Sequence, residues 1–273
     1  MSVRKPILVL AALPLLAAVS YQSQIADWRA KREASLKRDG GWLTVTGLFW
    51  LHDGRNTFGT GSKNDITLPV GPAAAGIFEL RGGKVTVDMN DSRKAMRPDS
   101  DDVVNVGRVR LYVIQRSDRF GIRMKDPESP FLRAFHGIEA FPANEEYRVT
   151  ARFVTDPRKI PIANIVGQTE PEDSPGYVVF RLHGQEYRLR PVLDDPGSKS
   201  LFFIFRDLTS QKETYGAGRF LDTGPPQDGK VVLDFNKAYN PPCAFTPYAT
   251  CPLPPKENRL AVRIEAGEKK YGH

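Results

Sequence analysis

Polar side chains able to bind a ligand or catalyse a reaction are concentrated between residues 206 and 258. Arginines there can hold an anion, a carboxylate can orient a guanidinium or move a proton, and hydroxyl and amide groups can fix a ligand. The candidate ligand-binding residues are Arg206, Tyr215, Arg219, Asp234, Asn236, Tyr239, Asn240 and Asn258. This segment is where we expect a polar site.

Asp234 and Arg219 are the candidate catalytic residues. In a functional interpretation, Arg206 or Arg219 holds an anionic or carbonyl-bearing ligand, Asp234 orients the guanidinium, and Tyr239 offers a hydroxyl. In a structural interpretation, Asp234 pairs with one of the two arginines and the neighbouring asparagines bond turn backbone. The sequence leaves both open.

Cys243 and Cys251 enclose a short loop with prolines on both sides. In an oxidising compartment the economical interpretation is a disulfide, which by loop entropy contributes about 2.5 kcal/mol. The alternative is a nucleophilic Cys243 partnered by a histidine.

No metal and no cofactor is expected. The histidines are scattered, and His136 and Glu139 would share a face only on a helix, which Gly137 and Pro142 disfavour. The run from Gly59 to Lys63 lacks the ending of a phosphate-binding loop.

The elements that must position these side chains are mainly strands. A charged periodic pattern predicts one helix over 22–38, within an N-terminal segment 21–40. Short apolar or alternating runs then predict strands at 42–51, 66–68, 77–80, 84–88, 108–115, 120–124, 147–153, 177–182, 185–190, 201–206, 230–236 and 260–264. The fold class is therefore mainly β: an N-terminal antiparallel β-sandwich over 41–126, a junction over 127–142, and a second β-rich half over 143–273.

Alternation along the predicted strand 230–236 shows how the site could be built. It turns Val231 and Leu233 into the core and leaves Asp234 and Asn236 on the opposite face. That face meets water, a pocket or a buried network.

Several segments carry a family resemblance. Gly216 to Asp222, Leu233 to Phe245, Ala249 to Pro255 and Glu257 to Leu260 resemble the signature of the bacterial and archaeal family called domain of unknown function 1684. Trp42 to Leu51 is similar to that family's N-terminal signature. The resemblance implies a fold and a site location, but no activity.

The N-terminal half also resembles the opening of a forkhead-associated β-sandwich, in Phe58 to Leu68 and Ala73 to Phe78. Thr60 stands where that family has its phosphate-binding arginine. The resemblance implies the sandwich fold without the phosphate chemistry.

The first residues predict export. Arg4 and Lys5 precede an apolar run from Ile7 to Val19, which indicates a signal peptide over 1–20 and a periplasmic or secreted protein. The alternative is an uncleaved N-terminal membrane anchor with the protein facing the periplasm. No membrane span is expected after cleavage.

Charge does not indicate a nucleic-acid partner. The net charge is +7, but acidic residues are interspersed with basic ones, and Arg4 and Lys5 would leave with the signal. The expected partner is an unknown small molecule or protein.

Two functions follow from these observations. The first is an exported ligand-binding or interaction module with its site near Arg219, Asp234, Asn240 and the loop from Cys243 to Pro255, with no assignable activity. The alternative is a hydrolase-type enzyme that uses Asp234 as acid or base and Arg206 or Arg219 as an electrostatic clamp. A closed pocket holding Asp234, with Arg219 and Tyr239 in reach, would favour the enzyme, whereas a solvent-filled groove or a filled core would favour binding or a structural role.

Overall fold

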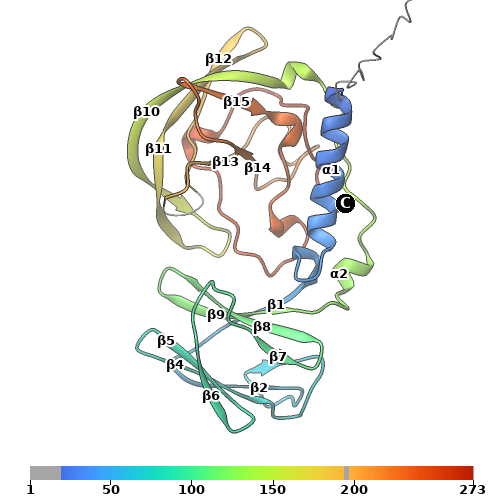
Figure 1. Cartoon of the computed structure of the whole chain (residues 1–273), viewed down its shortest axis with the longest axis vertical. Coiled ribbons are helices and arrows are strands. Elements are labelled where there is room, and N and C mark those ends of the chain that lie inside the picture. Colours follow the sequence, from blue (N-terminus) through green and yellow to red (C-terminus); the bar gives the residue numbers. More distant parts are fainter. Residues whose placement is uncertain (1–19, 194–196, 273) are drawn as a thin grey trace, which may run out of the picture.

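The computed structural model describes residues 20–193 and 197–272 of the chain. Two bodies lie one above the other in Figure 1, and the long helix α1 (Tyr21–Lys37) runs along the upper one. The predicted fold class, mainly β with one N-terminal helix, is confirmed. The predicted signal peptide lies, apart from Ser20, outside the described residues.

The lower body is an antiparallel β-sandwich, apart from one short parallel strand pair. One sheet has the order β1 (Val45–Trp50), β9 (Arg119–Lys125), β8 (Val109–Arg116), β7 (Val104–Val106). The other has the order β3 (Ile66–Thr67), β2 (Gly54–Gly59), β4 (Gly76–Arg81), β5 (Lys84–Met89), β6 (Ser92–Met96). Apolar side chains from both sheets, including Phe58, Phe78, Leu111 and Ile122, form one buried core between them.

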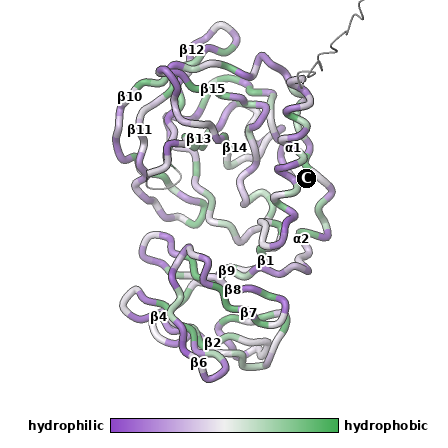
Figure 2. The backbone as a smooth tube through the Cα atoms, in the orientation of Figure 1, coloured by the Kyte–Doolittle hydropathy of each residue, from purple (hydrophilic) through white to green (hydrophobic). Residues whose placement is uncertain are grey.

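The upper body contains a four-stranded sheet and a two-stranded one. The larger has the order β12 (Gln185–Leu189), β11 (Thr169–Leu182), β10 (Arg148–Ala163), β15 (Lys230–Asp234), and the smaller pairs β13 (Leu201–Phe205) with β14 (Arg219–Thr223). Their core includes Phe180, Phe203, Phe205 and Phe235. In Figure 2, which colours the backbone by hydropathy, the turn at β12 is hydrophilic and the hydrophobic stretches lie within the strands.

Short helical segments connect these strands. They are α2 (Pro130–Arg133) and the 3₁₀ turns Trp42–Thr44, Glu145–Tyr147, Phe235–Lys237, Pro242–Ala244 and Lys256–Asn258. The last three carry much of the segment in which the polar site was predicted, because its many prolines prevent a regular strand ladder there.

Helix α1 begins at a serine cap and docks on the upper body. The Ser20 side chain accepts a hydrogen bond from the backbone N–H of Ser23 at 3.2 Å. Ile25 and Leu36 are buried although charged and other polar residues make up most of the helix. Leu36 packs with Leu43 and Phe245, so the helix contacts the segment that carries the cysteines.

Two sequence predictions about strands were wrong in detail. Residues 260–264 form no regular strand. Their backbone makes isolated hydrogen bonds instead, such as the one from the Leu260 N–H to the Arg206 carbonyl at 2.7 Å. The strand predicted over 230–236 ends at Asp234, which caps the 3₁₀ turn Phe235–Lys237. Strands β2, β6, β7 and β14 were not predicted, since their short or charged sequences lack a clear alternation.

The two bodies contact each other through side chains of the cysteine loop. Thr246 Oγ1 donates to the Val45 carbonyl at 2.8 Å, and Arg116 Nε donates to Thr250 Oγ1 at 2.9 Å. The tip of the β10–β11 hairpin adds a bond from Gln168 Nε2 to the Arg116 carbonyl at 2.8 Å.

Candidate functional site

Arg219 lies wholly inside the upper body. Its guanidinium donates to Asp207 Oδ1 at 3.1 Å, to the Ile264 carbonyl at 3.0 Å and to the Ala266 carbonyl. Burial lowers the pKa of Arg219, and the Asp207 carboxylate opposes that shift. In the part of the chain that is described, no hydrogen bond or ion pair joins Arg219 to Asp234. Arg219 thus holds the C-terminal segment against β14.

Asp234 belongs to a separate network at the start of α1. The Tyr21 hydroxyl donates to Asp234 Oδ1 at 2.8 Å, and Asn236 Nδ2 donates to the Tyr21 oxygen at 2.7 Å and to the Asn144 carbonyl at 2.8 Å. Lys237 Nζ lies 3.8 Å from Asp234 Oδ2. Burial and the Asp234 carboxylate raise the pKa of Tyr21. Asp234 is thereby held in one orientation.

Asn240 belongs to a third network. Its backbone N–H donates to Glu268 Oε2 at 2.7 Å, and Arg32 on α1 bonds both Glu268 Oε1, at 3.2 Å, and the Asn240 carbonyl, at 2.9 Å. Burial raises the pKa of Glu268, and Arg32 opposes that shift. Gly267 has φ +77°, and a Cβ there would lie 2.4 Å from the Ala238 carbonyl oxygen, so glycine is required beside this carboxylate.

Tyr239 contacts both Arg32, which belongs to the third network, and Asp222, which lines a groove on the surface. Its hydroxyl donates to Asp222 Oδ2 at 2.8 Å, and the guanidinium carbon of Arg32 lies 4.6 Å from the centre of its ring. Crowding by protein atoms raises the pKa of Asp222, and the Tyr239 hydroxyl opposes that shift.

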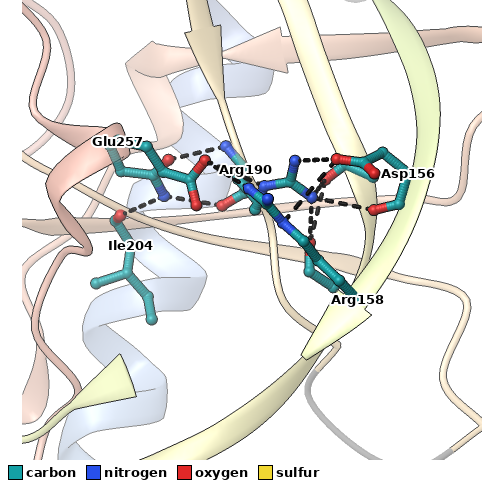
Figure 3. Close-up of polar contacts among 8 residues, drawn as sticks. Asp156, Arg158, Arg190, Ile204 and Glu257 are labelled. Carbon is teal, nitrogen blue, oxygen red and sulfur yellow. Dashed lines mark hydrogen bonds and ion pairs between the residues drawn. The ribbon is translucent and has the colours of Figure 1, made fainter. Parts of the chain in front are cut away.

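Asn258 lies in a fourth network, drawn in Figure 3. Its side chain accepts from the Arg190 backbone N–H at 2.8 Å and donates to the carbonyls of Arg190, at 2.8 Å, and Ile204, at 2.9 Å. The Arg190 guanidinium lies between Glu257, which its Nε reaches at 3.1 Å, and Asp156, whose carbonyl its NH1 reaches at 3.1 Å. These contacts fasten the segment after the cysteines to β10.

The remaining predicted residues, Arg206 and Tyr215, lie apart from Asp234. Arg206 is half-buried, and among the described residues its side chain has no hydrogen bond or ion pair, while its backbone bonds Asn258 and Leu260. Burial raises the pKa of Tyr215, and the nearby cysteine sulfurs add to that shift. Tyr215 therefore lies beside the cysteine pair.

Cys243 and Cys251 are free thiols in this structure. Each backbone N–H nonetheless points at the other sulfur, at 3.1 Å for Cys243 N to Cys251 Sγ and 3.3 Å for Cys251 N to Cys243 Sγ. The predicted disulfide stays a prediction.

A groove of about 590 Å³ runs between β15 and the segment that follows β14. Within the described part of the chain, Asp234 is the one predicted site residue that lines this groove. The lining residues are Arg148, Thr150, Asp222, Thr223, Gly224, Pro225, Gln227, Asp228, Lys230, Val231, Val232, Asp234 and Lys237. The structure therefore divides the predicted site among several networks and opens one of them to solvent.

Several partners in these networks were missed by sequence reasoning. Arg190, Glu268, Tyr21 and Asp222 belong to no motif, and the partners named above lie 17 or more positions away. Asp207 differs from them, because its place directly after the apolar run of β13 and Arg206 is visible in the sequence.

Residues 20–193 and 197–272 contain no group of three or more histidine, cysteine, aspartate or glutamate side chains placed to hold a metal ion. None of the helices in these ranges has the length and apolar character to cross a membrane.

The fold and these networks define a β-rich protein of two bodies, with polar clusters that stiffen its C-terminal half. Within this class, the chain belongs to a family described as protein of unknown function (DUF1684), whose model matches residues 133–269. An uncharacterized protein of Haloarcula marismortui, solved by solution NMR, is 32% identical over 53% of this chain and 82% of its own, with a TM-score of 0.43. No curated protein matches.

Proposed function

We propose that this protein is an exported binding module whose ligand lies in the groove beside Asp234. The volume of about 590 Å³ falls in the range of small-molecule sites. Acidic and basic side chains both line it: Asp222, Asp228, Asp234, Arg148, Lys230 and Lys237. A ligand that carries charges of both signs, such as an amino acid or a short peptide, matches this lining.

The observation that carries the proposal is the fixed position of Asp234. Tyr21 and Asn236 hold one carboxylate oxygen from inside, and the other oxygen lies toward Lys237 at the groove. A side chain already held in place loses little conformational entropy when a ligand binds. Val232, 47% exposed in the same groove, offers an apolar contact beside the charges.

The hydrolase-type alternative has less support. It needs Arg206 or Arg219 as an electrostatic clamp, but Arg219 is engaged with Asp207 and neither arginine lines the groove. Export remains part of the proposal. It is supported by the basic start, the apolar run and the small residues at Ala18 and Ser20.

Thermal unfolding in the presence of lysine, glutamate and dialanine, on the chain without residues 1–19, tests the groove. We expect a saturable rise in Tm with at least one of them. Val232→Trp should abolish the rise by filling the groove. Leu208→Trp, at another exposed apolar residue outside the groove, should retain it. The absence of any saturable rise, or an unchanged rise in Val232→Trp, contradicts the proposal.

A further inference from the structure

Cys243 and Cys251 lie close together as a pair of free thiols. The reciprocal N–H contacts to sulfur, at 3.1 and 3.3 Å, place the two residues face to face. A hydrogen bond between the thiols lowers the pKa of Cys243 and raises that of Cys251. Cys251 is only 6% exposed, whereas Cys243 is half-buried and can be reached from outside. The two sulfurs are therefore not equivalent.

A buried arginine from the other body lies beside them. Arg123, on β9, is 9% exposed, and among the described residues its Nε has no hydrogen-bond partner and its guanidinium has no ion pair. Its contacts are Thr250 Oγ1, at 3.4 Å from NH2, and the ring of Trp42, 5.1 Å from the guanidinium carbon. Burial lowers the pKa of Arg123 to about 10, so it is charged at neutral pH.

An isolated buried cation is unfavourable unless an anion compensates it. Asp99, which is itself paired with Arg116, offsets part of this cost, and the two cysteine sulfurs are the neighbours that can add a further negative charge. After the hydrogen bond from Cys251, the charge of Arg123 also lowers the pKa of Cys243. A thiolate at Cys243 would accept hydrogen bonds from the Cys251 N–H and the Cys251 thiol, and the charge of Arg123 would stabilise it further.

We propose that Cys243 and Cys251 form a thiol–disulfide exchange centre, in which Cys243 attacks as the thiolate, Cys251 resolves, and Arg123 of the sandwich stabilises the thiolate. The co-reactant is a disulfide, R–S–S–R. This centre is separate from the groove beside Asp234, and neither proposal depends on the other.

The chemistry takes two steps. Cys243 thiolate attacks one sulfur of the co-reactant, its S–S bond breaks, and a mixed disulfide forms with release of RS⁻. Cys251 then gives its proton to the released thiolate and attacks Cys243 Sγ, which breaks the mixed disulfide and releases a second RS⁻. The two cysteines are oxidised to one disulfide, and the co-reactant is reduced to one thiol, RSH, and one thiolate, RS⁻.

Oxidised glutathione is the probe for this proposal, and it is added to the reduced protein comprising residues 20–273. We expect complete conversion to an intramolecular disulfide, seen as loss of both titratable thiols. In Cys251→Ser, a single glutathione should remain attached at Cys243, located by peptide mass spectrometry. In Cys243→Ser, Cys251 should react at least tenfold more slowly, because it is buried and the co-reactant cannot reach its sulfur.

The role of Arg123 has its own control. Arg123→Gln should slow alkylation of Cys243 by iodoacetamide at pH 7 about tenfold, and Arg123→Lys should restore most of the rate. Arg119→Gln, on the same strand but over the Trp50 ring, should leave it unchanged. Circular dichroism verifies that the variants are folded. Equal reactivity of the two cysteines, or an unchanged rate in folded Arg123→Gln, overturns the proposal.

Discussion

Arg219 donates a hydrogen bond to Asp207 at 3.1 Å, and each of these side chains is only 1% exposed. Asp207 also accepts the Ile264 N–H at 2.7 Å and the Thr209 hydroxyl. The sequence had left open whether Arg219 holds a ligand or pairs with Asp234. The observed partner is neither, so the arginine joins the end of the chain to the strand pair β13–β14.

Loss of Arg219 should therefore affect stability. We expect Arg219→Ala to lower the free energy of unfolding by about 3–5 kcal/mol, because it leaves Asp207 charged and buried without its cation. Urea unfolding measures the change. Arg206→Ala, which removes a side chain without a polar partner among the described residues, should change it by less than about 0.5 kcal/mol.

A double variant separates the buried charge from the packing. Arg219→Met with Asp207→Asn removes both charges, and we expect it to be more stable than Arg219→Ala. If Arg219→Ala unfolds within about 0.5 kcal/mol of the parent chain, the internal role assigned to this arginine is wrong.

The Arg32–Glu268 pair predicts a pH dependence. Burial raises the pKa of Glu268 above its value in the unfolded chain, and Arg32 limits that rise. Without Arg32, the folded state would hold the proton of Glu268 to a higher pH than the unfolded state does. Stability then falls as pH rises from the unfolded pKa through the folded pKa. Arg32→Gln should thus cost about 3 kcal/mol at pH 7 and less near pH 3.5, where the main loss is its contacts with the Asn240 carbonyl and the Tyr239 ring.

The adjacent residue supplies the control for this pH experiment. Lys31 pairs with Asp27 at 2.7 Å, but both side chains are more than half exposed. Lys31→Gln should therefore change stability by less than about 0.5 kcal/mol at either pH. A loss in Arg32→Gln that is the same at pH 3.5 and pH 7 would show that Glu268 does not titrate in this range.

Local patterns predicted the strands better than the site. The apolar run 201–205 and the alternation of 230–234 are visible in the sequence, because a strand needs only its own residues to show its two faces. The same alternation correctly separated Leu233, which is in the core, from Asp234.

The site could not be predicted in the same way because its partners come from distant elements. Tyr21 and Asp234 are 213 positions apart, and Arg32 and Glu268 are 236 apart. The sequence shows that a buried charge needs a partner, but several arginines and carboxylates could satisfy the same requirement. Only the docking of α1 on the upper body decides among them.

Asn258 offers a test of the network in Figure 3. It is fully buried and makes three hydrogen bonds to backbone groups of Arg190 and Ile204. Asn258→Ala would leave these groups without partners, so we expect a loss of about 2–3 kcal/mol in urea unfolding. The exposed Asn105 on β7 is the matched control, and Asn105→Ala should be close to neutral. Equal effects of the two substitutions would argue against a stabilising role for Asn258.

The position at which the predicted signal peptide is cleaved should affect the stability of the folded protein, because that position coincides with the start of α1. Ser20 caps the helix through its bond to the Ser23 N–H, and Tyr21 is anchored to Asp234. Cleavage after Ser20, the end of the predicted signal, would remove the cap and place an ammonium group at the positive end of the helix dipole. We therefore expect a chain that starts at Tyr21 to be about 1 kcal/mol less stable than one that starts at Ser20.

Point substitutions separate the cap from chain length. In the chain that starts at Ser20, Ser20→Ala should reproduce the loss of about 1 kcal/mol, whereas Ser23→Ala should not, because Ser23 contributes only its backbone N–H to the cap. If both substitutions have the same effect, the cap does not stabilise the helix. Intact mass of the protein after expression with residues 1–19 then identifies its first residue, which shows whether processing at the predicted signal keeps Ser20 or leaves Tyr21 to hold the helix start through Asp234.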